Sequence, residues 1–181
     1  MKKICVVICL ISILFNLAGC IGNRRRFSEN EIESRANEFA KTVISAISEY
    51  DEEKFDNLFT DEALSSPDYE KGKAYILEIF EGEIISFQQS SYSYGGNHSK
   101  YGKSYTPKIA YDIKTDKNDY SLYMHFYVDG YNTDTGKHYK NKIMRLRLDI
   151  KSELPENEFY VNNGGMGDLE GIYYPEIELD Y

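Results

Sequence analysis

Ser121-Leu122-Tyr123-Met124-His125-Phe126-Tyr127-Val128 is a stretch in which apolar side chains alternate with polar or amphipathic ones. A period of two places successive side chains on opposite faces of a β-strand. The stretch therefore predicts a strand with one face in a core and the other in water. The expected core face consists of Leu122, Met124, Phe126 and Val128.

Three further stretches continue the alternation on either side of this strand. Apolar positions recur at every second residue over 109–113 and 144–150, and in residues 85–94 Ile85 and Phe87 begin a strand that runs on through polar residues to Tyr94. Clean alternation is typical of antiparallel strands that bury one face and leave the other wet. We therefore predict an antiparallel sheet, with long loops at residues 95–104 and 129–142.

The strand registers can be predicted from the same parity. Placing Thr115 opposite Tyr120, and Val128 opposite Met144, keeps every apolar residue on one face. The exposed face would then carry three cross-strand rows. These are Asp112–Tyr123–Asp149, Ala110–His125–Arg147 and Lys108–Tyr127–Arg145.

The residues before the strands have a helical pattern instead. Ser28 and Glu31 fit a capping box, and apolar residues follow over residues 32–50 mostly at steps of three and four. Asp51 and Asp68 can cap two further helices, the second ending at Gly82. Helices followed by an antiparallel sheet predict an α+β domain, with N-terminal helices packed on one face of a curved sheet.

Several motifs in this order resemble a known fold. The segment of residues 51–60, the turn Phe80-Glu81-Gly82-Glu83, the strand from Tyr120 and the terminal Gly171-Ile172-Tyr173 resemble the cystatin-like, nuclear transport factor two-like cone. More narrowly, residues 30–175 resemble an uncharacterised family of Gram-positive bacterial lipoproteins with that domain. The resemblance implies the cone but no activity, because this fold hosts binding modules, isomerases and inert scaffolds alike.

The first twenty residues have the pattern of a secretory signal. Lys2 and Lys3 precede an apolar run of fourteen residues, 4–17, which is too short for the about 20 residues of a membrane-spanning helix. The run ends in Leu17-Ala18-Gly19-Cys20, which resembles the bacterial lipobox. That resemblance implies cleavage before Cys20 and a lipid on its sulfur, a palmitate-type anchor on the extracytoplasmic face of the cell membrane.

We therefore divide the chain into four parts. Residues 1–19 would be the signal peptide, and residues 20–27 the lipidated cysteine with a short basic tether. Arg24, Arg25 and Arg26 in this tether would contact anionic headgroups. Residues 28–154 would form the cystatin-like domain, and residues 155–181 a loop-rich acidic segment that docks in part.

The net charge argues against nucleic-acid binding, and the cysteine content argues against a disulfide. Loss of residues 1–19 removes Lys2 and Lys3 and no acid, so the formal net charge moves from −9 to −11. A chain this acidic is a poor nucleic-acid binder, because that affinity comes mainly from phosphate neutralisation. Cys5 and Cys9 would leave with the signal and Cys20 would be alkylated, so no disulfide is expected.

No motif in the sequence predicts a metal, a cofactor or a catalytic residue. His98, His125 and His138 lack metal-ligand spacing, and the segment from Gly96 to Ser104 departs from phosphate-loop spacing by one residue. The loop with Asn132, Asp134 and Gly136 lacks the terminal Glu of a calcium loop. Enzymes of the cone fold place an Asp or Tyr acid/base pair inside it. Here Tyr111 is the one titratable residue expected there.

The predicted wet face of the sheet is the remaining candidate site. It gathers cationic and aromatic side chains: Tyr123, His125, Tyr127, Arg145 and Arg147, with Lys108 at the edge. Such a face is either solvated, with a few cross-strand pairs, or a contact surface for an acidic partner chain, an anionic wall polymer or a second copy. His125 would add a pH dependence between about pH 5 and 8.

We accordingly expect a non-catalytic binding or interaction module held at the outer face of the membrane. The alternatives are an isomerase or hydrolase that uses the cone cavity, or a structural component of the envelope.

Overall fold

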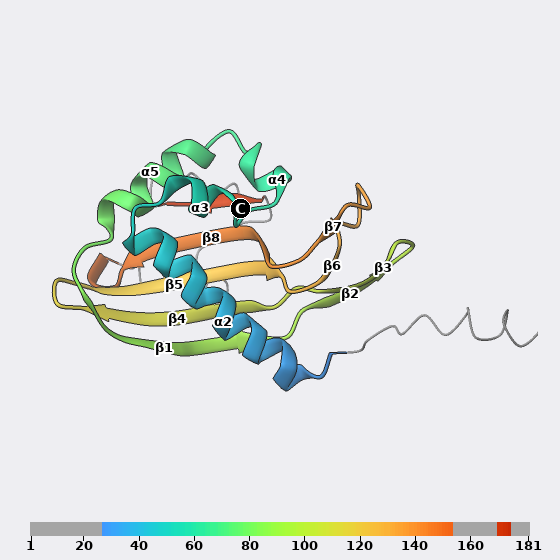
Figure 1. Cartoon of the computed structure of the whole chain (residues 1–181), viewed down its shortest axis with the longest axis horizontal. Helices are drawn as coiled ribbons and strands as arrows, with labels where there is room; N and C mark the ends of the chain where they lie inside the picture. The colour runs from blue at the N-terminus through green and yellow to red at the C-terminus, as the bar shows by residue number, and fades with distance from the viewer. Residues whose placement is uncertain (1–26, 154–169, 175–181) are drawn as a thin grey trace, which may run out of the picture.

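Helices come first in the chain and lie together on one side of the sheet. A computed structural model describes residues 27–153 and 170–174. The helices are α2 (Glu29–Ser48), α3 (Glu52–Asp56), α4 (Asp61–Leu64) and α5 (Tyr69–Ile79). In Figure 1, α2 crosses the sheet diagonally, whereas α3, α4 and α5 lie along the edge where β8 runs. The predicted α+β class, with helices on one face of a curved sheet, is confirmed.

Five strands form this sheet, and its spatial order is β1-β4-β5-β8-β9. They are β1 (Ile84–Ser93), β4 (Lys108–Thr115), β5 (Asp119–Tyr127), β8 (Lys142–Ile150) and β9 (Gly171–Tyr173). All neighbours are antiparallel except β8 and β9, which are parallel. The four long strands were predicted by alternation, while β9 adds a short parallel edge. A 3-10 turn, η1 (Lys151–Glu153), follows β8.

The two stretches predicted as loops contain hairpins. The first has β2 (Gly96–Ser99) and β3 (Gly102–Tyr105), and the second has β6 (Gly130–Tyr131) and β7 (His138–Tyr139). The prediction of a loop over residues 95–104 was therefore wrong. These strands are too short and too polar to show the alternation from which longer strands are recognised.

The β4–β5 register differs by two residues from the predicted one. Ile113 pairs with Tyr120, not Leu122, because the turn is tighter than expected. Thr115 closes that turn: its backbone N–H donates to the Asn118 carbonyl at 2.9 Å, and its Oγ1 accepts from the Asn118 N–H at 3.0 Å. Since side chains alternate with a period of two, this slip leaves each residue on its predicted face.

An irregularity between β5 and β8 changes the end of the sheet. The register shifts between His125 and Phe126, so that Phe126 pairs with Ile143. Ile143 therefore lies in the main core, at the place that the sequence predicted for Met144. Met144 instead packs with Tyr127 and Tyr139 in a small separate cluster. A bulge re-aims side chains in this way, and simple alternation does not predict it.

The helices α2 and α3 begin at the residues that the sequence predicted. Ser28 Oγ accepts from the Glu31 N–H at 3.2 Å, and Asp51 Oδ1 accepts from the Lys54 N–H at 2.9 Å. Asp68 precedes α5 without a capping hydrogen bond from its side chain. Gly82 has φ +90°, the left-handed conformation expected where the chain leaves α5.

The core fills the space between α2 and the sheet. Ile32, Val43 and Ile47 of α2 are fully buried, as are Leu122 and Met124 of β5. Tyr111 is buried as well, and its hydroxyl donates to Asn37 Oδ1 at 2.8 Å. Of the helices in the described residues, none is both long and apolar enough to cross a membrane. The predicted signal (1–19), the tether residues 20–26 and most of residues 155–181 lie outside the described residues.

Candidate functional site

A cleft of about 480 Å³ opens at the rim of the sheet, outside the apolar core. It lies between α4, the loop of the β6–β7 hairpin, β8 and the residue that precedes β9. The lining residues are mostly polar: Glu62, Ser66, Pro67, Asn132, Asp134, Thr135, Arg145 and Glu170. We call this feature the rim cleft.

Glu62 on α4 accepts hydrogen bonds through both of its carboxylate oxygens. Its Oε2 accepts from the Tyr139 hydroxyl at 2.5 Å, and its Oε1 accepts from Asn132 Nδ2 at 3.2 Å and Thr135 Oγ1 at 3.4 Å. Burial, reinforced by the hydrogen bond to Glu62, raises the pKa of Tyr139. The carboxylate is thus held in a fixed position by three partners from the β6–β7 hairpin.

The opposite wall is shaped by an asparagine turn. Asn132 Oδ1 accepts from the backbone N–H groups of Asp134 at 2.9 Å and Thr135 at 3.0 Å. Gly136 follows with φ +73° and donates its N–H to the Asn132 carbonyl. The asparagine therefore serves the turn, as expected from the sequence. Within residues 27–153 and 170–174, no group of three or more His, Cys, Asp or Glu residues is placed to hold a metal ion.

Glu170 brings a second carboxylate to the rim cleft from a distant part of the chain. Thr60 Oγ1 donates to Glu170 Oε2 at 2.5 Å. Thr60 Oγ1 also caps α4, because it accepts from the Ala63 N–H in the first turn of that helix. Burial raises the pKa of Glu170, and Glu62 adds to this effect. With Arg145 as the cation of the lining, the rim cleft can bind a polar ligand that carries cationic or hydroxyl groups.

Two of the five residues predicted for the wet face are buried. Arg147 is 2% exposed and Tyr127 is 5% exposed, whereas Tyr123, His125 and Arg145 are half-buried. The prediction that all five side chains are exposed to solvent was therefore wrong, although Tyr123 pairs with Arg147 and His125 with Arg145 on one face of the sheet. That they bind a partner stays a prediction.

The rows on this face also shift by two residues. They read Asp112–Ser121–Asp149, Ala110–Tyr123–Arg147 and Lys108–His125–Arg145. Tyr127 leaves the row because of this two-residue shift, which puts His125 between Lys108 and Arg145. Arg147 Nε donates to Asp149 Oδ2 at 2.6 Å, an ion pair whose two side chains are 3% and 5% exposed. Much of the predicted cationic charge is therefore satisfied within the sheet.

The pKa of His125 differs from the value expected for a histidine. Its Nδ1 lies 3.3 Å from Arg145 Nη1. Burial, together with the charges of Arg145 and Lys108, lowers the pKa of His125 to about 3. The ring is therefore neutral between pH 5 and 8, which corrects the predicted pH dependence.

Part of the predicted patch does reach the rim cleft. Arg145 lines it, and Tyr127 lies close enough for the cleft carboxylates to act on it. Burial, with Glu170 and Glu62, raises the pKa of Tyr127 to about 12. Glu62, Glu170 and Tyr139 could not be predicted from the sequence, since no local pattern brings together residues from α4, β7 and the start of β9.

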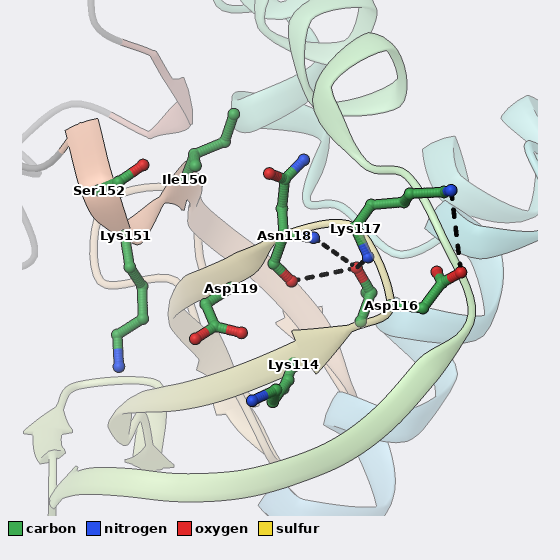
Figure 2. Close-up of a pocket in the computed structure, with 9 residues that line it drawn as sticks. Lys114, Asp116, Lys117, Asn118, Asp119, Ile150, Lys151 and Ser152 are labelled. Carbon is green, nitrogen blue, oxygen red and sulfur yellow. Dashed lines mark hydrogen bonds and ion pairs between the residues drawn. The ribbon is translucent and has the colours of Figure 1, made fainter.

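A second cavity of about 470 Å³ lies at the β4–β5 turn. Figure 2 shows Lys114, Asp119 and Lys151 among the side chains that line it, with Asp116 and Lys117 paired at the turn. Lys151 also pairs with Asp112 at 3.0 Å. These side chains are mostly exposed and their charges are largely paired, so the rim cleft is the better candidate site.

The fold and the rim cleft together define an α+β domain with a filled core and a polar cleft at one end of its sheet. Residues 42–152 match the family described as a domain of unknown function, DUF5104, and the chain belongs to this family. The matched residues include Glu62, the asparagine turn and Arg145, but not Glu170. No curated protein and no solved structure matches the chain.

Proposed function

We propose that the protein is a lipid-anchored binding module on the extracytoplasmic face of the cell membrane, and that it takes a polar ligand in the rim cleft. One observation carries the binding part. The interior between α2 and the sheet is packed with fully buried apolar side chains, while polar groups converge outside it. An interior of this kind favours a scaffold whose ligand binds at the rim.

The lipoprotein assignment rests on the lipobox at Leu17-Ala18-Gly19-Cys20. Helices laid on a curved sheet also agree with a cystatin-like cone, which we propose as the finer fold assignment. Intact mass or metabolic palmitate labelling tests the anchor. We expect a lipid on Cys20 that Cys20→Ala abolishes, and unmodified secreted protein from the wild-type gene would refute it.

Ligand binding is tested by a thermal-shift screen against glycans, peptides and small metabolites. Any ligand that stabilises the wild type is then tested on Glu170→Gln, which removes a charge that lines the rim cleft. Asp119→Asn is the matched control, because it removes an exposed carboxylate at the other cavity. We expect Glu170→Gln to lose the shift and Asp119→Asn to keep it. Equal loss in both variants would place the ligand elsewhere.

One observation favours an enzyme as the second candidate. A carboxyl whose pKa is raised by burial, as at Glu170, can act as a general acid. A hydrolase using the rim cleft would turn over the ligand that the screen finds. Glu170→Gln would then abolish turnover, whereas a binding module gives no product with either protein.

A further inference from the structure

The β2–β3 and β6–β7 hairpins are hydrogen-bonded and packed against each other at one end of the molecule. Ser104 Oγ donates to the Tyr131 carbonyl and accepts from the Tyr131 N–H, both at 2.8 Å. The Tyr101 ring lies so close to Gly136 that a Cβ there would meet it at 2.7 Å. Figure 1 shows the two hairpins projecting side by side beyond the sheet. We call residues 95–105 and 130–142 the hairpin tip.

The hairpin tip is basic although the chain is acidic. It contains one acid, Asp134, against five lysines: Lys100, Lys103, Lys137, Lys140 and Lys142. Its formal charge of +4 contrasts with −9 for the chain. Lysine ammonium groups also lie over tyrosine rings, Lys100 at 4.8 Å from Tyr101 and Lys103 at 4.6 Å from Tyr105. Lys137 pairs with Asp61 and Lys142 donates to the Asn57 carbonyl, so Lys100 and Lys103, beside their tyrosine rings, are lysines that the hairpin tip offers to a partner.

Tyrosines are exposed beside these lysines. Tyr101 at the β2–β3 turn is 37% exposed, and Tyr94 just before the hairpin is 43% exposed. A tyrosine ring with an apolar body and a polar hydroxyl suits the boundary between lipid and water. Lysines bury their aliphatic stems there and keep their charge at the headgroups.

The hairpin tip lies at the end of the domain that the N-terminal chain enters. The Phe27 ring packs edge-on against Tyr105 of β3, with 5.2 Å between centroids. Phe27 lies seven positions after Cys20, and an extended chain of that length spans at most about 25 Å. If Cys20 carries a lipid, as proposed above, the tip is within that reach of the bilayer.

We propose that the hairpin tip rests on the anionic phospholipid surface of the membrane. The lysines bind headgroup phosphates, and the Tyr94 and Tyr101 rings enter the interface between them. The anchor supplies attachment, and the tip fixes the orientation of the domain. This inference rests on the proposed lipid anchor, which its experiment measures separately.

The chain has no tryptophan, so one introduced tryptophan reports on a single position. Tyr101→Trp is placed in the lipidated full chain and reconstituted in phosphatidylglycerol or phosphatidylcholine vesicles. We expect a blue-shifted emission, and quenching by brominated lipid, in phosphatidylglycerol only. Ile85→Trp is the matched control, because Ile85 is 63% exposed and lies at the opposite end of the sheet. Its emission should be the same in both vesicles.

Charge reversal tests the role of the lysines. Lys100→Glu with Lys103→Glu should lower the ratio of docked to undocked tip by at least about 30-fold, since loss of each basic residue near an anionic surface costs about 1 kcal/mol and the new carboxylates are repelled. Lys114→Glu with Lys117→Glu, at the β4–β5 turn, should change this ratio less than twofold.

Vesicle flotation separates the two proposals. Protein that fails to float refutes the anchor. Protein that floats with Tyr101→Trp emission unchanged refutes the tip contact and leaves the anchor intact. A blue shift produced by a soluble anionic wall polymer, and absent with phosphatidylglycerol, would overturn the lipid surface as partner.

Discussion

At the level of single side chains, the Arg147–Asp149 pair has the strongest consequence for stability. Both side chains are almost fully buried and lie 2.6 Å apart. Breaking a buried ion pair by removing one partner costs about 3–5 kcal/mol. We therefore expect Arg147→Met or Asp149→Leu to lower the free energy of unfolding by that amount. The double variant should lose much less, and denaturant unfolding measures all three. Additive losses would contradict a coupled pair.

His125 predicts how stability depends on pH. Its pKa is about 3 in the folded chain, against about 6.5 when unfolded. Between these values the unfolded state binds a proton that the folded state does not, so stability falls as pH drops below about 6.5. We expect His125 to lower the free energy of unfolding by ~2 kcal/mol as the pH falls from 7 to 5. Denaturant unfolding of the wild type and His125→Asn at both pH values measures it. An equal pH dependence in both proteins would contradict it.

Among the secondary-structure elements, β9 depends on one small residue of α5. A Cβ at Gly72 would lie 2.6 Å from Cβ and Cγ2 of Ile172. Gly72→Ala should push β9 away from α5, and the overpacking costs about 1–3 kcal/mol against a helix gain of about 1. Hydrogen exchange should then quicken in residues 171–173. Ala74→Gly, exposed on the same helix, should lower stability without this local change. Unchanged exchange in both variants would show that α5 yields instead.

The elements also show how far the sequence could predict the structure. Alternation located β4, β5 and β8 because each buries one face, and capping side chains located the starts of α2 and α3. Register was less predictable, because a slip of two residues preserves every face. Alternation gave no sign of the bulge that pairs Phe126 with Ile143 and puts Ile143 in the core instead of Met144. The rim cleft could not be predicted either, because Thr60 and Glu170 meet across 110 residues.

For the molecule as a whole, charge and chain length together determine orientation. The anchored chain, with a formal net charge of −11 after loss of residues 1–19, is repelled by an anionic bilayer at long range, while the +4 hairpin tip is attracted at contact. The Debye length of about 8 Å at physiological salt lets the near charges dominate over the distant ones. A tether of seven residues is too short for the domain to turn over freely. The β4–β5 turn should therefore point away from the membrane.

Single cysteines can test this orientation, because Cys20 would be the one cysteine left after removal of the signal, and its sulfur would carry the lipid. Lys100→Cys places a thiol on the hairpin tip, and Lys117→Cys places one at the opposite end, where the side chain is 61% exposed. In phosphatidylglycerol vesicles, a bulky impermeant maleimide should modify Lys117→Cys several-fold faster, because the headgroups shield the tip. In detergent the two rates should converge. Equal rates in vesicles would mean that the domain tumbles at the end of its tether. Faster modification of Lys100→Cys would mean that the opposite end faces the lipid.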